Sequence, residues 1–536
     1  MGVSENPEME RGGQEAGVAD GRGEEKENID ANGREEEEKD EKGVVEEEKK
    51  VENEMNMSRL RTSNPVPTIQ IQTPSPAQTR SIHIATQNTP GSQQQMTPSW
   101  ASMNSTNYTN HIFLFLFLFH VLVAVTAVGF LIYRAVEGLL QNGKWKRKEK
   151  QLLEFWLPQV EGSAIISIFL AWAWQRAFRQ WPAFMVRFIL WSSFILSLTA
   201  GILLLCFSMA ATDGVGIALI GFAVGNGLYT CWVTPRIGFA AKVIEKSLEP
   251  AAKFPDLNQP TYWLLAIGFV WMSLCSFAVI GALNFHFPPL LIIGLVLSLM
   301  WTTEVLRNVV NLTVCRAVSL YYLRGMQSTT QFCFQRAMSR NLGSACLGSL
   351  FVPTIEALRI VARVLNLLKG EDEFMFSCAH CCLKMMEAIF RCGNGWAFVH
   401  IAAYGRSFVT ASRTTWALFE SAGMEIIVDS DITSAICFLT GITSGSVCLI
   451  VAASWTHAEH KGFTATVSML AFFIGYLMTR IGMAMPHACV SCYYVCYAEN
   501  PGFRLFDNTI KQRIELIRAG HDVVVPTPRL SRRPII

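Results

Sequence analysis

Long apolar segments recur along most of this chain, and they restrict its possible folds more than any other feature. The first, HIFLFLFLFHVLVAVTAVGFLIY from His111 to Tyr133, contains no acidic or basic residue apart from two histidines. A helix needs about 20 apolar residues to cross the hydrocarbon core of a membrane, and only helices and closed barrels satisfy the backbone there. The sequence therefore predicts an all-α integral membrane protein. Composition agrees, because 51% of the 536 residues are hydrophobic and only 16% are charged.

Counting these segments predicts about ten transmembrane helices. They are Gly162–Phe178, Phe184–Ala211, Gly214–Val233, Tyr262–Leu283, Pro289–Leu312, Leu342–Leu367, Trp396–Arg413, Ile432–Trp455 and Phe463–Met485 or beyond, besides the first segment. An even number places both tails on one side of the membrane. Basic residues in the loop TPRIGFAAKVIEKSLEP and in the C-terminal tail favour the cytoplasm for that side. The basic segment 142–150 and the basic residues within 359–391 argue against this orientation.

The segments divide the chain into three parts. Residues 1–110 form a predicted disordered cytosolic tail, acidic at first and then rich in Ser, Thr, Pro and Gln. Nearly half of the 43 acidic residues lie in the first 55 positions of this tail. Residues 111–499 form the predicted transmembrane domain, and 500–536 a second cytosolic tail. We expect a multi-pass protein of the plasma membrane, with internal membranes as the alternative location.

Cysteines are concentrated in the segment CAHCC, from Cys378 to Cys382. A zinc site needs two pairs of ligands at defined spacing, and a second pair is missing here. Acylation of Cys381 or Cys382 near the membrane surface, or simple packing, explains the segment better. We therefore expect no metal site and no cofactor. No Walker loop or nucleophile elbow occurs in its expected context, so we expect neither an enzyme nor a nucleic-acid partner.

One acidic residue, Glu304, stands within the long apolar sequence LVLSLMWTTEVLRNVVNLTVC. On a helix it shares one stripe with Trp301, Asn308, Asn311 and Cys315. Because a charged side chain facing lipid at the bilayer centre costs about 3 kcal/mol, the stripe must face protein or water. One interpretation is an ion pair between Glu304 and Arg307 that ties helices together. The other is a cation site, since the face of Trp301 attracts quaternary ammonium.

Several motifs, in order, resemble the choline transporter-like family. They are WTTEV, RNLGSACLGSL, CCLKMMEAIF, AFVHIAAYGRSFVTASRTTWALF, AICFLTGITSGSVCLI and CVSCYYVCYAENPG, and the resemblance runs from about Tyr133 to Leu516. It implies a ten-helix solute carrier with cytosolic tails that transports choline or a related amine. The link Arg134–Glu161 is short, whereas animal members carry a large glycosylated loop there.

Small residues in this region have two interpretations. Gly343, Ser344, Gly348 and Ser349 allow close packing of membrane helices, or, with Pro353 nearby, they break a helix beside a transport pathway. The same two interpretations apply to Gly405.

Aromatic residues follow next in the chain. Tyr404 and Phe408 lie four residues apart and either pack in the core or complete an aromatic cage with Trp301. His400 either accepts a coupling proton or forms a structural hydrogen bond. The predicted substrate-binding residues are thus Trp301, Glu304, Asn308, Tyr404 and Phe408.

These features predict alternating-access transport of choline or a related cationic amine or amino-alcohol. The alternatives are a non-transporting membrane protein for lipid homeostasis or trafficking, and a carrier of a larger lipid-like molecule. Composition does not indicate an oligomeric state.

Overall fold

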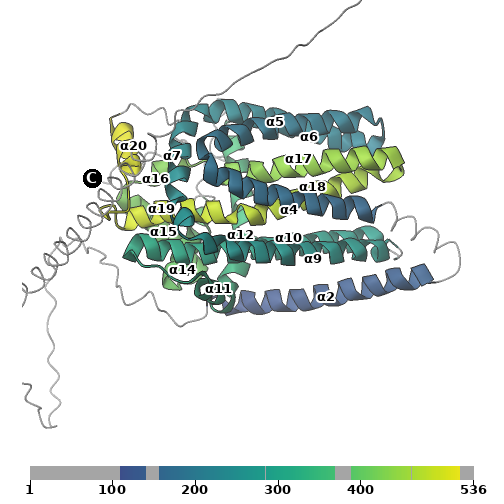
Figure 1. The fold of residues 1–536 in the computed structure, drawn as a ribbon, viewed down its shortest axis with the longest axis horizontal. Coiled ribbons are helices and arrows are strands. Elements are labelled where there is room, and N and C mark those ends of the chain that lie inside the picture. The colour runs from purple at the N-terminus through teal and green to yellow at the C-terminus, as the bar shows by residue number, and fades with distance from the viewer. Residues whose placement is uncertain are drawn as a thin grey trace, which may run out of the picture. The chain divides into compact units, whose positions relative to one another are not determined.

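The computed structural model describes residues 109–140, 156–283, 285, 287–367, 385, 388–459 and 461–519. All regular elements in these ranges are helices, and the long ones run side by side (Figure 1). The long helices are α2 (His111–Leu140), α4 (Leu157–Gln180), α5 (Pro182–Cys206), α6 (Ala210–Val233), α9 (Gln259–Ala282), α10 (Pro288–Arg324), α12 (Leu342–Leu367), α17 (Thr433–Glu459) and α18 (Thr464–Gly482). The shorter ones are η2 (Thr234–Arg236), α7 (Ile237–Ser247), α8 (Glu249–Lys253), η3 (Pro255–Asn258), α11 (Thr330–Ser339), α14 (Ala397–Tyr404), α15 (Phe408–Ala422), α16 (Glu425–Asp429), η4 (Lys461–Phe463), α19 (Ala484–Glu499) and α20 (Thr509–Arg518).

The all-α membrane fold is confirmed. Among the described residues, seven helical stretches are long and apolar enough to cross a membrane. They include α2, α5, α6, α9, α10, α17 and α18, each of which overlaps a segment that the sequence predicts to span and some of which extend beyond it. Helix α4 lies beside α17 and α18 but is more polar, and α12 has a shorter apolar part, Leu342–Leu358. The total of ten spans therefore stays a prediction.

The outer surface of the bundle is apolar, as a lipid-facing surface must be. Phe115 is 68% exposed and Leu122 65% exposed on α2, and Trp263 on α9 is 65% exposed. Lipid tails are as apolar as these side chains, so burying them against protein would bring no hydrophobic gain. The exposed apolar residues mark the surface that meets the bilayer.

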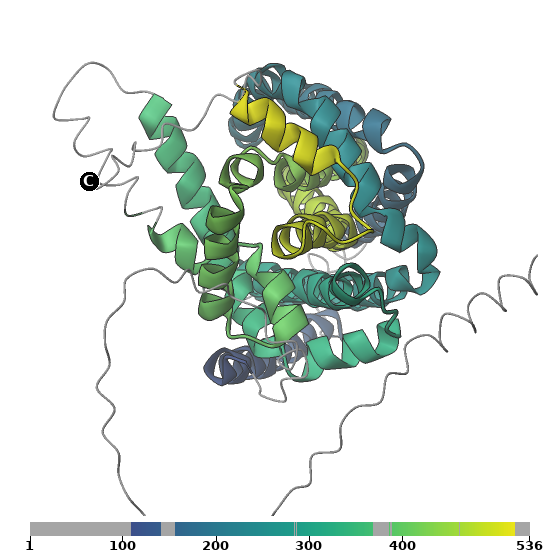
Figure 2. The ribbon, with the colours of Figure 1, turned by 90° about the vertical axis from the view of Figure 1, so that its left-hand side faces the viewer.

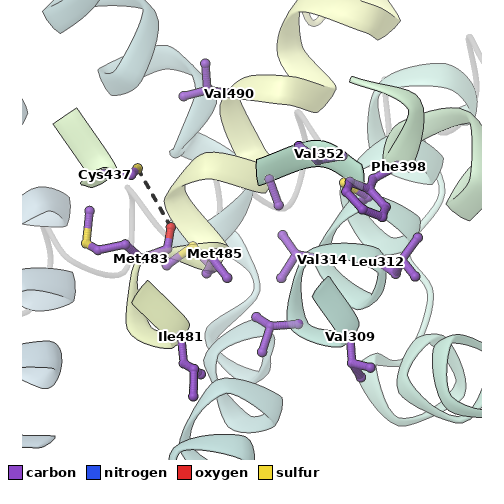
Figure 3. Close-up of a cluster of buried hydrophobic side chains, with 14 of the residues drawn as sticks. Val309, Leu312, Val314, Val352, Phe398, Cys437, Ile481, Met483, Met485 and Val490 are labelled. Carbon is purple, nitrogen blue, oxygen red and sulfur yellow. Dashed lines mark hydrogen bonds between the residues drawn. The ribbon is translucent and has the colours of Figure 1, made fainter. Parts of the chain in front are cut away.

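The core lies around α10 and α19. Every residue of α10 from Asn308 to Leu320 is buried, and α19 is buried on nearly all sides. A helix that is buried on all sides lies in the middle of a bundle, and these two pack against each other. Figure 3 shows part of this core, with Val309, Leu312 and Val314 of α10 near Val352 of α12.

Two helices are interrupted near the core. Gly405 ends α14 with φ of +66°, a left-handed conformation that favours glycine, and α15 begins three residues later. Met483 separates α18 from α19, and its carbonyl oxygen lies 4.0 Å from the Cys437 thiol (Figure 3). A break near Pro353, which the sequence offers as one of two interpretations, does not form, because α12 continues through Pro353 as one helix.

Two segments predicted as a loop and a tail contain amphipathic helices. The loop after Val233 forms α7, whose apolar face is buried, and the C-terminal segment forms α20, with Ile510 fully buried. Helix α20 lies across the end of the bundle (Figure 2). The predicted N-terminal tail up to residue 108, the basic segment 142–150, the CAHCC segment and residues 520–536 lie outside the described residues.

Hydrogen bonds fix the start of α20. Asp507 accepts bonds from the hydroxyls of Tyr493 in α19 and Thr509 in α20. Burial raises the pKa of the Asp507 carboxyl, but these bonds favour its charged form more strongly, so its pKa is below the ordinary value. The charged form of Asp507 thus holds α20 against α19.

Candidate functional site

Glu304 lies near the middle of α10 and takes part in a buried ion network. Its carboxylate accepts hydrogen bonds from Arg307, one turn further along α10, and from Arg480 of α18, at 3.2 and 3.4 Å to its two oxygens. The three side chains are only 11–14% exposed. The network therefore joins α10 to α18 and carries two positive charges for each negative one. The pair with Arg307 is the one that the sequence suggests.

Other polar groups surround this network. The Arg480 guanidinium lies over the Tyr476 ring at 5.8 Å. His487 of α19 lies within electrostatic reach of both arginines, and its Nε2 is 3.1 Å from Ser434 Oγ of α17. Its Nδ1 is buried and has no hydrogen-bond partner in the described part of the chain. Helices α10, α17, α18 and α19 thus converge on one polar region inside an apolar bundle.

Trp301 lies one turn before Glu304 and contacts α2. Its ring centroid is 4.5 Å from that of His120 and 5.4 Å from that of Phe117. Within the described ranges, Trp301 Nε1 and His120 Nδ1 are buried without a hydrogen-bond partner. Buried donors and acceptors are normally satisfied by protein or water, so this aromatic cluster can accept a further polar group.

The rest of the polar stripe faces protein. Asn308 Nδ2 donates to Ser349 Oγ of α12 at 2.8 Å, and Cys315 Sγ lies 3.3 Å from Asn311 Oδ1. Asn308 is 2% exposed. In this conformation it joins α10 to α12.

Tyr404 lies at a different level of the bundle, whereas Phe408 lies against α12 at Gly348, next to the Ser349 that bonds Asn308. The Tyr404 hydroxyl donates to Glu499 at the end of α19, and its ring contacts His400 at 5.5 Å. Phe408 packs against Phe398 at 5.9 Å. Phe408 is therefore a core residue here, and Tyr404 is paired with a carboxylate that the sequence analysis missed.

The distance along α10 separates this level from Glu304. Arg316 of α10 donates to the carbonyl oxygens of Ala402 and Ala403, immediately before Tyr404, at 3.0 and 2.7 Å. Arg316 lies twelve positions after Glu304, which corresponds to about 18 Å of helix. The structure thus separates Tyr404 from the stripe of Trp301, Glu304 and Asn308. Phe408 lies against α12 at Gly348, beside the Ser349 that bonds Asn308.

The small residues of α12 mediate close packing. A Cβ added at Gly343 would lie 2.5 Å from the Asn110 carbonyl oxygen, and one at Gly348 would lie 2.5 Å from the Phe398 ring. Ser344 Oγ donates to Thr109 Oγ1 at 2.7 Å. These contacts match the packing interpretation, and of the predicted set only Gly405 lies at a break between two helices, α14 and α15.

Two charged residues, Arg480 and Glu499, were not among the predicted site residues. Arg480 interrupts the apolar sequence GYLMTRIGMAM in the same way as Glu304 interrupts its own, so a search for isolated charges finds it. Glu499 belongs to the motif CYAENPG but lies at the end of an apolar segment, where a carboxylate is unremarkable. No cluster of three potential metal ligands occurs among the described residues.

A polytopic α-helical bundle with a buried ion network between two spans is an architecture found among membrane transport proteins. The profile of the family described as "Plasma-membrane choline transporter" matches residues 217–502, more than half of the chain. This protein therefore belongs to the choline transporter-like family, and the resemblance seen in the sequence is confirmed.

Curated relatives are similar over parts of their length. A CTL-like protein of Dictyostelium discoideum is 24% identical over 352 residues, which cover 63% of this chain and 62% of the relative. Protein PNS1 of Mycosarcoma maydis is 25% identical over 251 residues, or 44% of this chain and 47% of the relative. The chain thus matches less than two thirds of each relative. Membership of this family points to membrane transport as the class of function.

Proposed function

We propose that this protein transports choline or a related small cationic amine or amino-alcohol across a membrane by alternating access. We further propose that Glu304 receives the ammonium group of the substrate and that Trp301 contributes an aromatic face. The plasma membrane, with both tails in the cytosol, is the proposed location. The observation that carries the proposal is the ion pair between Glu304 and Arg480, which joins two different helices.

An incoming cation can replace Arg480 as the partner of Glu304. Removing one partner of a buried ion pair costs about 3–5 kcal/mol because a charge is left uncompensated. A substrate ammonium that takes the place of Arg480 keeps Glu304 neutralised, and the attraction of Glu356 on Arg480 lowers the cost for the displaced arginine. Binding would then release α18 from α10 and favour a different arrangement of the bundle.

Interrupted helices support movement of this kind. The interruption at Met483 directly follows α18, the helix that carries Arg480, and the one at Gly405 lies at the other level of the bundle. In carriers, such discontinuous helices line substrate sites and act as hinges between rocking parts. A cationic substrate also gains about 2.3 kcal/mol per 100 mV of membrane potential, so uptake needs no coupling ion.

One alternative also has direct support in the geometry. Glu304 is fully bonded by Arg307 and Arg480, which suffices to hold α10 and α18 together in a protein that transports nothing. Such a protein would support lipid homeostasis or trafficking. A carrier of a larger amino-alcohol or lipid precursor is the third possibility.

Uptake of labelled choline in cells that lack their own choline carriers tests the proposal. Wild type is compared with Glu304→Gln, Glu304→Asp and Trp301→Ala at matched abundance in the assayed membrane. We expect saturable, voltage-sensitive uptake by wild type, loss in Glu304→Gln and Trp301→Ala, and partial retention in Glu304→Asp, which keeps the charge. Competition by unlabelled ethanolamine and phosphocholine distinguishes an amine carrier from one that accepts larger lipid precursors.

A further variant separates binding from packing. Arg480→Gln removes the competitor for Glu304, so we expect a lower KM for choline together with a lower maximal rate. A purely structural ion pair predicts loss of abundance without any decrease in KM. Absence of uptake by wild type that reaches the assayed membrane would refute choline transport.

A further inference from the structure

Glu499 has an unusual hydrogen-bonding state. One carboxylate oxygen accepts the hydroxyl of Tyr404, whereas the other, Oε2, is buried and has no partner among the described residues. Leaving a buried acceptor unsatisfied costs about 1–3 kcal/mol, and more when the group is charged. Such a group in a membrane bundle calls for an explanation.

Two other carboxylates near this end of the bundle also pair with tyrosine, and they show what a structural pair looks like. Asp507 accepts a tyrosine hydroxyl at one oxygen and the Thr509 hydroxyl at the other. Asp431 accepts a tyrosine hydroxyl and Thr433 Oγ1 at one oxygen, and the Thr433 backbone N–H at the other. Both oxygens of each carboxylate are satisfied. Glu499 differs from them because only one of its oxygens is bonded.

The nearest cationic side chain does not complete the pair. Arg406 lies over the Tyr404 ring at 5.4 Å, and it acts on Glu499 only through longer-range attraction. No ion pair joins Arg406 to Glu499 in the described part of the chain. Glu499 also ends α19, where the partial negative charge of the helix terminus adds to its own. The local field therefore favours a cation.

The groups around Glu499 suit an organic cation. Tyr404, 7% exposed, places its aromatic ring beside the carboxylate with Arg406 over that ring, so a bound ammonium would take the place of Arg406 there. His400, 3% exposed, contacts that ring, and its Nε2 has no hydrogen-bond partner within the described ranges. A carboxylate oxygen beside an aromatic face is the combination that binds ammonium groups, including those without N–H donors.

We propose that Glu499 and Tyr404 form a second binding position for the ammonium group of the transported substrate. This inference rests on the proposed function. The position is separate from Glu304, since about 18 Å of α10 lies between the two levels. Both levels contact α10 and α19, so a substrate that leaves Glu304 can next be held by Glu499 before it exits at the end covered by α20.

Equilibrium binding of labelled choline to the purified full chain in lipid nanodiscs tests the inference. We expect two choline molecules per wild-type chain, one per chain for Glu304→Gln, one for Glu499→Gln, and none for the double variant. Glutamine keeps an oxygen that accepts the Tyr404 hydroxyl, so Glu499→Gln removes charge with little change of shape. The affinity of the lost position should fall at least tenfold.

Two further variants distinguish a binding role from a structural one. Tyr404→Phe keeps the ring and removes the hydroxyl, so the affinity for choline should stay within about threefold of wild type. Tyr404→Leu removes the ring and should lower the affinity by more than that. If the pair only stabilises the fold, Tyr404→Phe should reduce choline binding as much as Glu499→Gln does. Glu459→Gln is the matched control. That carboxylate accepts bonds from Trp455 and Gln159 elsewhere in the bundle, and its variant should bind two molecules.

Each outcome decides between the two proposals. One molecule per wild-type chain, lost in Glu304→Gln and kept in Glu499→Gln, overturns the second position and leaves the proposed function intact. No binding to wild type, together with no uptake in cells, overturns both. Loss of all binding in Glu499→Gln with unchanged melting temperature also overturns two separate positions, because it indicates one shared site.

Discussion

The ion network at Glu304 allows a quantitative prediction about stability. Arg480 Nη2 lies 3.2 Å from Glu304 Oε1. At an effective dielectric constant of about 20 this corresponds to a gross attraction of about 5 kcal/mol. Desolvation of both groups offsets most of that energy, so the net contribution is far smaller. The loss of stability caused by each substitution therefore depends on which buried charges remain without a partner.

The two single substitutions leave different charges. Glu304→Gln leaves Arg307 and Arg480 buried together with only the longer-range attraction of Glu356 on Arg480, and we expect it to lower the free energy of unfolding by about 3 kcal/mol. Arg480→Gln leaves the Glu304–Arg307 pair intact, so about 1.5 kcal/mol should be lost. The double variant retains one uncompensated arginine and should lose about 2.5 kcal/mol. The predicted coupling between Glu304 and Arg480 is thus about 2 kcal/mol.

Unfolding of the purified protein in mixed micelles by increasing SDS, followed by circular dichroism, measures these differences. Thr199→Ala on the exposed face of α5 serves as a control for mutation in a lipid-facing span. Additive losses within 0.5 kcal/mol would show that Glu304 and Arg480 do not interact energetically. An Arg480→Gln variant as unstable as Glu304→Gln would show that Arg307 does not neutralise the carboxylate.

Further predictions concern packing and the bundle end. Gly343→Ala should cost about 1–3 kcal/mol of unfolding free energy in the same assay, because its Cβ would collide with the Thr109 carbonyl. Gly221→Ala in α6 meets open space and should be neutral or stabilising, so equal losses at both positions would contradict the packing argument. Gly405→Ala forces a side chain into left-handed backbone and should cost about 1–2 kcal/mol, with a fall in melting temperature as the readout. Asp507→Asn should speed hydrogen exchange in α20. The pKa of Asp507 is lower in the folded state than in the unfolded state, so its charged form stabilises the fold. In wild type, the protection of α20 from exchange should therefore be complete above the unfolded-state pKa and be lost as pH falls through the folded-state pKa. Protection that does not change at acid pH would refute this.

Much of the fold was predictable from local sequence. Hydropathy locates all the long helices of the described ranges, since the cost of exposing polar groups to lipid applies to every segment independently. Amphipathic helices α7 and α20 were missed because their mixed composition is also typical of loops and tails. The break at Pro353 was suggested by local propensity, and continuous packing of α12 overrode it.

The candidate site was predictable only in part. An isolated charge in an apolar segment identifies Glu304, and helical spacing correctly suggests Arg307 as one partner. Arg480 lies 176 residues further along the chain and Glu499 lies 95 residues beyond Tyr404, so no periodicity relates them. The expected cage of Trp301 with Tyr404 is instead two clusters, because α10 is long and its two halves contact different helices.

The sequence by itself determines that this protein is an α-helical membrane protein of the choline transporter-like family, and where its long helices lie. These properties depend on composition, periodicity and ordered motifs, all of which are read along the chain. Only the tertiary structure decides which charges meet. A buried carboxylate must find a partner in three dimensions, and the packing of α10 against α18 and α19 supplies Arg480 to Glu304 and brings Glu499 to Tyr404.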